Sequence, residues 1–483
     1  MTALQGPAAI RDFFRHNYTP FHYVSTSTFN LLGADTWINN LTFINTIDSF
    51  DGQHPHIFVP HDALAHGLHG IEAANSYLLK HQAVVDYLHQ RGPNGAVLFL
   101  MFDASTERLA RHLGLRVCFP PAALRRSLDS KVTTTRLANR AGVPSVPNVL
   151  ARVESYATLR RVAHALGPDV VVQLPYGDSG TTTFFIATEA DFQPYARQIA
   201  EQPTVKIMQR IRCRPLTIEG CVTRHGTLVG PLMTEMIGCA ELTPYRGGWC
   251  GNEVFAERES TALSPELRQQ AQRATVAIGE HIRQAGYWGY FGLDFLLDQD
   301  TGALYLGELN PRITGITSLT SQAALDQDEV PLLLFHVLEW LGVEYAVDIA
   351  QFNQWWVKAE QITSWSQMII EHTADTADMV TQAPPTGVWR MATDGTVHFA
   401  RPAFHPQALT SDAEAFFIRT IDAGHTPVKG DCIGRLMTRG RLMTDEYQLT
   451  ERAKIWSRGL RAQFATAATN SSRRRSLFPV MAH

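Results

Sequence analysis

The stretch GYFGLDFLLDQDTGALYLGELNPRITGITS, residues 289–318, decides the fold of this chain. It contains two apolar, β-rich runs, FGLDFLLD and ALYLGELN, separated by the short polar segment QDTG. Such a pattern is typical of two strands that are joined by a tight turn and pair as antiparallel neighbours. The hairpin would return Glu308 to the side of Asp294. We therefore expect these two carboxylates to lie close together.

The carboxylate pair predicts a metal site. Two carboxylates held this close repel each other unless a cation lies between them. Mg²⁺ is commonly held by one or two carboxylates and takes its other ligands from phosphate and water, and the amide oxygen of Asn310 would complete such a set. Hard oxygen ligands favour Mg²⁺ over zinc, with Mn²⁺ as the alternative ion.

An arginine follows the carboxylates on the same strand. Arg312 lies two residues after Asn310, so strand alternation aims both side chains to the same side. Its planar guanidinium group suits pairs of phosphate or carboxylate oxygens. The alternative is an acidic hairpin edge that is neutralised by a structural arginine. Apolar flanks disfavour this alternative, because an unpaired buried acid costs free energy.

The composition is that of an ordinary globular protein. The chain has 483 residues, of which 45% are hydrophobic and 18% are charged, so we expect two to four packed domains. The net charge of -4 does not indicate nucleic-acid or membrane binding. No apolar run has membrane-spanning length, the first residues lack a signal-peptide pattern, and the six cysteines show neither metal spacing nor a disulfide framework. A cytoplasmic location is expected.

Alternating strands and helices in the first part of the chain predict a parallel α/β layer. Residues 97–102 and 115–119 have strand patterns, and residues 105–113 have a helical one. The same part contains a cluster of histidines, at His54, His56, His61, His66 and His69. A zinc site would need further ligands at fixed distances, which the sequence does not show, so exposed or hydrogen-bonded histidines are the alternative.

Three segments upstream of the hairpin suit a nucleotide. Asp129, Ser130 and Lys131 precede a predicted helix that ends at Gly142. The segment VVVQLPYGDSGTTTFFI, residues 170–186, places a small-residue loop between two strands, an arrangement that lays backbone amides over phosphate oxygens. Residues 205–211 and 215–222 are two further strands that flank a bend, and a plain hairpin is the alternative.

In this order, the lysine helix, the glycine loop, the bend and the carboxylate hairpin resemble the ATP-grasp superfamily. Its members are ligases and carboxylases that use ATP to activate a carboxylate as an acyl phosphate. The resemblance covers roughly residues 124–322, and biotin carboxylases are the closest architectural comparison. It implies an ATP-grasp fold of the α/β and α+β class in three parts: an N-terminal parallel α/β domain (1–123), an ATP-grasp domain (124–345, with a flap at about 166–222) and a C-terminal β-rich domain (346–483) with a disordered basic tail.

The resemblance also implies roles for single residues. The phosphates would lie against Lys131, Gln173 and the loop residues Gly177, Ser179, Gly180 and Thr181. The adenine would lie in the bend, at Gln209, Arg210, Ile211 and Arg212, with Glu219 in the following strand. The metal would be held by Asp294, Glu308 and Asn310. Arg312 would be catalytic, because it would stabilise charge on the transferring phosphoryl group.

Two positions depart from the family pattern. Gln173 stands where the family usually carries a second phosphate-binding lysine, and Gln209 stands where an acidic residue is typical. Glutamine keeps a hydrogen-bond donor but lacks a full charge. These departures leave a non-catalytic nucleotide-binding scaffold as one alternative.

Two further segments are expected near the second substrate. Residues 244–255, PYRGGWCGNEVF, are predicted as a loop over the triphosphate or the substrate, with Trp249 and Asn252 as contacts, and a tight surface turn is the alternative. By resemblance, small or hydroxyl-bearing residues after the hairpin would shape the substrate pocket: Thr314, Gly315, Thr317 and Ser318. The segment 264–285 is predicted as a packing helix, and residues 387–401 as a hairpin.

These inferences together predict an ADP-forming ligase. It would use ATP and Mg²⁺ to activate a carboxylate as an acyl phosphate and would join it to an amine, making an amide or peptide bond. The partners are expected to be small-molecule acids and amines, without nucleic acid or membrane, and a homodimer is compatible with the pattern. A biotin-carboxylase-like enzyme that activates bicarbonate would share every nucleotide residue and is the second alternative.

Overall fold

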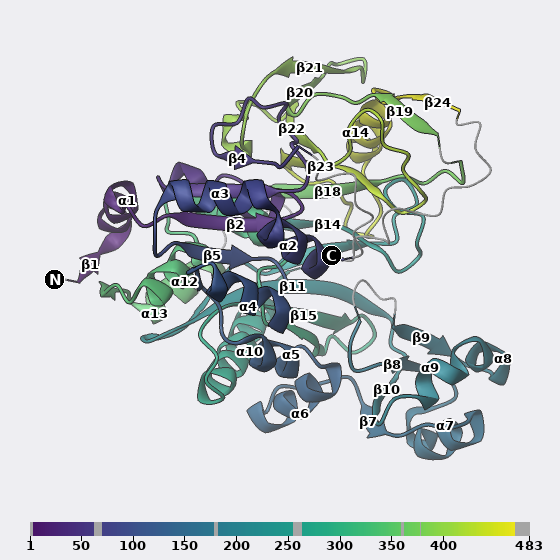
Figure 1. Cartoon of the computed structure of the whole chain (residues 1–483). Coiled ribbons are helices and arrows are strands. Elements are labelled where there is room, and N and C mark those ends of the chain that lie inside the picture. Colours follow the sequence, from purple (N-terminus) through teal and green to yellow (C-terminus); the bar gives the residue numbers. More distant parts are fainter. Residues whose placement is uncertain are drawn as a thin grey trace.

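The computed structural model describes residues 3–61, 70–177, 182–254, 263–358, 362–376 and 378–468. Its strands form a parallel sheet near the N-terminus, a four-stranded sheet, one large antiparallel sheet and two small pairs (Figure 1). Among the described residues, every helix is too short or too polar to cross a bilayer. The predicted basic tail, His66 and His69 lie outside the described residues.

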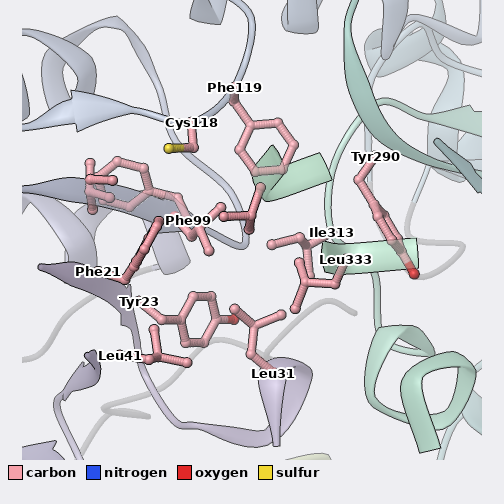
Figure 2. Close-up of a cluster of buried hydrophobic side chains, with 14 of the residues drawn as sticks. Phe21, Tyr23, Leu31, Leu41, Phe99, Cys118, Phe119, Tyr290, Ile313 and Leu333 are labelled. Atoms are coloured by element: carbon pink, nitrogen blue, oxygen red, sulfur yellow. The ribbon is translucent and has the colours of Figure 1, made fainter. Parts of the chain in front are cut away.

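The N-terminal sheet has five parallel strands in the order β4-β3-β2-β5-β6. They are β2 (Phe21–Ser25), β3 (Leu41–Asn45), β4 (Ile57–Phe58), β5 (Ala96–Phe99) and β6 (Arg116–Val117). The helices of this part are α1 (Gly6–His16), α2 (Ile71–Lys80), α3 (Gln82–Arg91) and α4 (Ala104–His112). The buried strands share one core with Ile313 and Leu333 from much later in the chain (Figure 2). The predicted parallel layer is confirmed, and its core packs against the segment that follows the carboxylate hairpin.

The next part of the chain holds two helices and a small antiparallel sheet. The helices are α5 (Ala122–Leu128) and α6 (Lys131–Ala141). Helix α6 starts where the Ser130 side chain accepts a hydrogen bond from the Thr133 amide, and it ends at Gly142, which has a φ of 67°. The small sheet has the order β7-β10-β8-β9, with β7 (Asn148–Ala151), β8 (Val170–Gln173), β9 (Thr183–Ile186) and β10 (Val205–Gln209). Helices α7 (Tyr156–Val162), α8 (Glu189–Phe192) and α9 (Ala196–Ala200) belong to the same region (Figure 1).

One large antiparallel sheet spans the rest of the molecule in the order β16-β15-β11-β13-β14-β18-β23-β22-β20-β21, with β12 paired to β11. In chain order, the first six strands of this sheet are β11 (Cys213–Thr223), β12 (Gly226–Val229), β13 (Met233–Ile237), β14 (Trp249–Val254), β15 (Gly289–Asp298) and β16 (Leu304–Asn310). The later strands are β18 (Trp365–Glu371), β20 (Gly387–Met391), β21 (Val397–Arg401), β22 (Glu414–Arg419) and β23 (Cys432–Arg439). The predicted hairpins β15–β16 and β20–β21 are confirmed. The sheet continues across the domain boundary that we predicted at residue 345, because β14 pairs with β18.

The predicted loop at residues 244–255 is wrong in its second half. Residues Trp249–Val254 form strand β14, which pairs with β13 on one side and with β18 on the other. Gly251 has a φ of 151°, and a Cβ atom there would lie 2.2 Å from the carbonyl oxygen of Gln367. The glycine therefore permits a close approach of two strands and does not mark a loop.

The remaining helices cover the large sheet or close the chain. They are α10 (Pro265–Gln284), α11 (Thr317–Leu325), α12 (Leu332–Leu341), α13 (Ile349–Val357) and α14 (Glu451–Arg461). The predicted packing helix is α10, which buries Ala271, Ile278 and Ile282. Two small pairs complete the fold, β1 (Leu4–Gln5) with β17 (Tyr345–Ala346) and β19 (Met379–Gln382) with β24 (Ala465–Ala467).

Candidate active site

The carboxylate hairpin has the geometry that its sequence predicts. Asp294 on β15 and Glu308 on β16 are paired positions of neighbouring strands. The Thr217 hydroxyl donates a hydrogen bond to one oxygen of Asp294 (3.0 Å), and the Asn310 amide nitrogen donates to the other (2.9 Å). Burial, together with the negative charge of Glu308, raises the pKa of Asp294 to about 6. The charge of Glu308 thus disfavours ionised Asp294, and a cation bound at the pair would relieve this repulsion.

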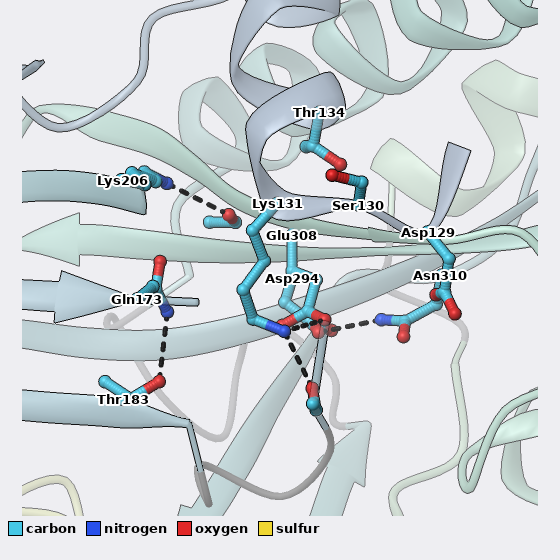
Figure 3. Close-up of polar contacts among 12 residues, drawn as sticks. Asp129, Ser130, Lys131, Thr134, Gln173, Thr183, Lys206, Asp294, Glu308 and Asn310 are labelled. Carbon is cyan, nitrogen blue, oxygen red and sulfur yellow. Dashed lines mark hydrogen bonds and ion pairs between the residues drawn. The ribbon is translucent and has the colours of Figure 1, made fainter. Parts of the chain in front are cut away.

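Lys131 reaches the same carboxylates from the start of α6 (Figure 3). Its Nζ atom lies 2.8 Å from Glu308 Oε1 and donates to the carbonyl oxygen of Gly177 at 2.7 Å. Only 3% of this lysine is exposed. The lysine thus joins three predicted elements, the helix, the beginning of the glycine loop and the hairpin.

Arg312 and Asn310 contact each other at the end of β16. Arg312 Nη2 donates to Asn310 Oδ1 at 2.9 Å, while the Asn310 nitrogen faces Asp294. The amide oxygen that we predicted as a metal ligand therefore accepts a hydrogen bond from the arginine. Metal binding through this oxygen would require the amide to rotate or Arg312 to release it.

These residues surround a cavity of about 280 Å³. The hairpin and the segment after it contribute Asp294, Leu296, Glu308, Asn310 and Arg312. Helix α6 and strands β8, β9 and β11 contribute Lys131, Gln173, Thr183 and Thr217. The remaining lining residues are Glu235, Ile237, Gly247, Trp249 and Thr314 to Ile316. The cavity thus lies between the small sheet and the large one, and it holds groups of both charges.

The predicted phosphate flap is only partly described. Strands β8 and β9 flank it as expected, and Gln173 donates to the Thr183 hydroxyl at 3.2 Å on the cavity wall. Gly177 has a φ of 148°. Ser179, Gly180 and Thr181 lie outside the described residues.

The predicted adenine bend connects two different sheets, because β10 belongs to the small sheet and β11 to the large one. It is therefore not a plain hairpin. Arg210 pairs with Asp169 (3.1 Å), and Arg212 pairs with Asp300 (2.5 Å). Gln209, Arg210, Ile211 and Arg212 are absent from the described lining of the cavity. Ile211 packs with the hydrophobic cluster that includes Leu296, a lining residue.

Glu219 lies in the strand that follows the bend, as predicted, but its carboxylate is enclosed by protein hydroxyl groups. It is buried, and it accepts hydrogen bonds from the hydroxyls of Thr314 and Thr317, both at 2.6 Å, and from Thr320 and Tyr290. Four hydroxyl donors satisfy the carboxylate inside the protein, so its geometry does not support a nucleotide contact. Burial raises its pKa. Glu219 fastens the start of α11 to the large sheet.

The predicted substrate residues divide into two groups. Trp249, Thr314 and Gly315 line the cavity. Thr317 and Ser318 are buried behind it, and so is Asn252, which accepts hydrogen bonds from the Trp249 indole (2.8 Å) and from Gln367 (3.3 Å). The geometry does not support direct substrate contacts for these three, because other protein atoms cover them.

Trp249 and Gly315 depend on each other. A Cβ atom on Gly315 would lie 2.5 Å from the indole ring. The ring therefore occupies its place on the cavity wall only because position 315 carries no side chain.

Our sequence interpretation did not include Glu235, a third carboxylate of the cavity. It lies on β13, and burial, then the charges of Asp294 and Glu308, raise its pKa well above the ordinary value, which a hydrogen bond with Asn252 opposes. A signal was present, since Glu235 is the single acid in the strand run MTEMI.

Lys206 was also absent from our interpretation. It is paired with Gln173 across β10 and β8, so both side chains lie on the same face of the small sheet. Its Nζ atom donates to the carbonyl oxygen of Gly307 at 3.4 Å (Figure 3). Burial lowers its pKa to about 8, an effect that the nearby Glu308 opposes. A lone lysine in an otherwise apolar strand run was the available signal.

Comparison with known proteins gives the same fold. No protein-family model matches the chain. The chain is 26% identical over 226 residues to the [Butirosin acyl-carrier protein]--L-glutamate ligase of Niallia circulans, covering 45% of this chain and 51% of that protein. It is 24% identical over 253 residues to biotin carboxylase 1 of Populus trichocarpa, covering 50% and 46%. The matched stretch therefore spans about half the length of these relatives.

A solved structure matches over nearly the whole chain. It is the biotin carboxylase domain dimer of Hydrogenobacter thermophilus 2-oxoglutarate carboxylase, in complex with MgADP, ADP and bicarbonate. The TM-score is 0.59 at 13% identity, and the match covers 94% of this chain and 91% of that one. The chain has the architecture of the ATP-dependent carboxylases and ligases. Its fold is the ATP-grasp fold, with a biotin-carboxylase-like arrangement of parts.

Proposed function

We propose that the chain is an ATP-dependent, ADP-forming ligase that activates a carboxylate as an acyl phosphate and joins it to an amine. The observation that carries this proposal is the set of Asp294, Glu308, Lys131 and Arg312 around one cavity. Two acids, a buried ammonium and a guanidinium suit a reaction in which positioning and charge neutralisation do most of the catalysis. The glutamate ligase relative supports an organic acid as the first substrate.

The acids of the hairpin fit Mg²⁺. They offer hard oxygens, and their mutual repulsion favours a divalent cation between them. When bound, the ion would supply charge neutralisation to the phosphate groups of ATP. Asp294 and Glu308 would hold it, and Lys131 would move from Glu308 toward the phosphates of ATP.

The chain's own groups would then carry two steps. Arg312 would hold the substrate carboxylate beside the γ-phosphorus; a carboxylate oxygen forms the new O–P bond, and the bond to the β–γ bridging oxygen breaks, which releases ADP. The amine nitrogen next attacks the acyl carbon. A C–N bond forms, the C–O bond to phosphate breaks, and the amine loses a proton as phosphate leaves.

Lys206 gives a reason why Gln173 does not exclude catalysis. Its ammonium group lies on the same face of the small sheet, one strand away from Gln173, and close enough to Glu308 and Lys131 to affect their charges. We therefore include Lys206 with Lys131 as the positive charges that face the nucleotide phosphates.

A bicarbonate-activating carboxylase is the second candidate, because the fold is that of biotin carboxylases. A dimer like the one named for the solved relative, and a cytoplasmic location, remain predictions for this chain.

Hydroxylamine trapping tests the proposal without knowledge of the natural amine. The full chain is incubated with MgATP, hydroxylamine and one acid at a time, beginning with L-glutamate, and ADP and hydroxamate are measured together. Equal amounts of ADP and hydroxamate with one organic acid would support the ligase. An ¹⁸O label in that acid should appear in the released phosphate.

The same assay separates the alternatives. ADP that depends on bicarbonate alone would indicate a carboxylase, and absence of ADP with every acid would indicate a scaffold. AMP and pyrophosphate would overturn the acyl-phosphate chemistry even in an ATP-grasp protein.

A further inference from the structure

Glu235 is the cavity carboxylate that the proposed chemistry leaves without a task. It lies on β13, which β11 separates from β15 in the large sheet, whereas Asp294 and Glu308 are directly paired on β15 and β16. Among the described residues, no group of three or more acidic, histidine or cysteine side chains is arranged to hold a metal ion. Glu235 is thus near the two carboxylates but is not part of their directly paired positions.

A buried polar network holds Glu235 in place. It is paired with Asn252 across β13 and β14, and the two side chains share a hydrogen bond. Asn252 accepts from the Trp249 indole and from Gln367, and Gln367 also donates to the carbonyl oxygen of Gly315 at 3.0 Å. Glu235, Trp249 and Gly315 are thus fixed relative to one another, and all three line the cavity.

The charges of the cavity favour a cationic ligand at this wall. Lys131 pairs with Glu308, and Asp294 receives hydrogen bonds from Thr217 and Asn310. Glu235 has no lysine or arginine partner within the described parts of the chain. Burial and the charges of Asp294 and Glu308 oppose ionisation of Glu235, and a cationic ligand beside it would favour the ionised carboxylate.

The surroundings of Glu235 match a primary amine in its ammonium form. A carboxylate accepts charge-assisted hydrogen bonds from ammonium, and an indole ring attracts a cation that lies against its face. Ile237, which is 38% exposed, offers apolar contact to the hydrocarbon part of the same molecule.

We propose that Glu235 and Trp249 form the subsite for the amine substrate, which binds as a primary ammonium ion with an apolar body. This proposal rests on the ligase function proposed above and names the class of its second substrate. Asn252 is a positioning residue of this subsite, because it acts through Glu235 and Trp249.

Binding of ethylammonium tests the subsite without turnover. The full chain is loaded with Mg²⁺ and a non-hydrolysable ATP analogue, and the apparent Kd of ethylamine hydrochloride is measured by saturation-transfer NMR. Glu235→Gln keeps the shape of the side chain but removes its charge, so the Kd should rise about tenfold or more. The matched control is Glu241→Gln, the same change at an exposed residue of the connection after β13, and it should leave the Kd within about twofold.

Three results would overturn the subsite. They are an unchanged Kd in Glu235→Gln, no ethylammonium binding to the wild-type chain, and a loss of Mg²⁺-nucleotide affinity in Glu235→Gln as large as the loss of amine affinity. The last result would make Glu235 a metal ligand. Because the measurement needs no ADP formation, the subsite and the ligase function fail separately: Glu235-dependent binding in a chain that forms no ADP would support the ammonium subsite and refute the ligase.

Discussion

Two hairpins of the large sheet contribute to the cavity, β15–β16 and β13–β14, with β11 between them, and the sequence predicts the first but not the second. The first has two clean apolar runs and a short polar turn, and it pairs as its sequence predicts. The second has an 11-residue connection, residues 238–248, and a glycine within its second strand. The local sequence is sufficient to predict the first hairpin. In the second hairpin, β14 also pairs with β18, a strand more than a hundred residues later in the chain, and the local sequence does not show this pairing.

The largest effect is expected from the first hairpin. Glu308→Gln removes one of the two carboxylates and the ion-pair partner of Lys131. We expect ADP formation to fall by about a thousandfold or more, because an electrostatic group of the reacting centre is lost. The rate is measured in the hydroxylamine assay, and circular dichroism checks the fold.

A matched change at the tip of the same hairpin provides the control. Asp300→Asn lies in the turn, where Asp300 pairs with the exposed Arg212. This variant should keep its rate within about twofold. Equal activity of Glu308→Gln and Asp300→Asn would show that the hairpin is structural.

Arg312→Lys tests whether the end of the first hairpin acts in the transition state. Lysine keeps the charge but loses the planar pair of donors, so kcat should fall about a hundredfold. Nucleotide affinity should change much less. An equal loss of ATP binding and kcat would instead assign Arg312 to ground-state binding.

The second hairpin is tested at Gly251. Alanine there would place a Cβ atom 2.2 Å from the Gln367 carbonyl oxygen, at a φ of 151°. We expect Gly251→Ala to lower the free energy of unfolding by about 2–3 kcal/mol, as overpacking and backbone strain do. Chemical denaturation gives the value. Gly247→Ala, where a Cβ atom meets nothing within 4 Å, is the control, and equal stabilities would mean that β14 is the loop we first predicted.

In the small sheet, the positive charge of Lys206 can be moved by mutation to position 173, its partner on the neighbouring strand. Lys206→Met should raise the Kd of ATP about tenfold, the effect of one lost charge interaction of about 1.4 kcal/mol. Adding Gln173→Lys should restore affinity to within about threefold, because the two positions are paired on one face. A double variant as weak as Lys206→Met would show that Lys206 does not act on the nucleotide.

The sequence was sufficient to predict the position of a side chain wherever the residue's own strand, turn or helix start determines that position. Asp294, Glu308 and Lys131 meet as predicted, because strand pairing and a helix start determine their positions. The spacing of residues in the sequence could not show whether a side chain faces the cavity or the protein interior behind it. Glu219 has the right strand but is covered by four hydroxyl donors, three of which come from a segment almost a hundred residues later.

The opposite error concerns two charged residues to which the sequence interpretation gave no role. Glu235 and Lys206 each interrupt an apolar strand run, and only the pairing of distant strands places them at or beside the cavity. A lone acid or lysine in a strand is thus a signal for a site only when the neighbouring strands are known.

The last test concerns the beginning of the first hairpin, where His336 packs against β15. The buried Nδ1 atom of His336 accepts a hydrogen bond from the Tyr290 amide at 3.0 Å, and burial lowers the pKa of His336 to about 3. In the unfolded chain this pKa would be near its ordinary value of 6.5. Between these values the unfolded state binds more protons, so the free energy of unfolding falls as the pH drops, by up to about 1.4 kcal/mol per pH unit.

His336→Asn removes this titration and should flatten the decline of stability between about pH 6.5 and pH 4. Chemical denaturation at several pH values gives the slope, which does not depend on how much the variant destabilises the protein at neutral pH. His398→Asn, a change of an exposed histidine on β21, should keep the wild-type slope. Other buried histidines such as His22 titrate in all three proteins, so their contribution cancels.

A slope in His336→Asn equal to that of the wild type would mean that the ring can take up a proton in the folded state. The folded state opposes protonation because Nδ1 already accepts a hydrogen bond from the Tyr290 amide and because the buried ring would deny an added charge its solvation.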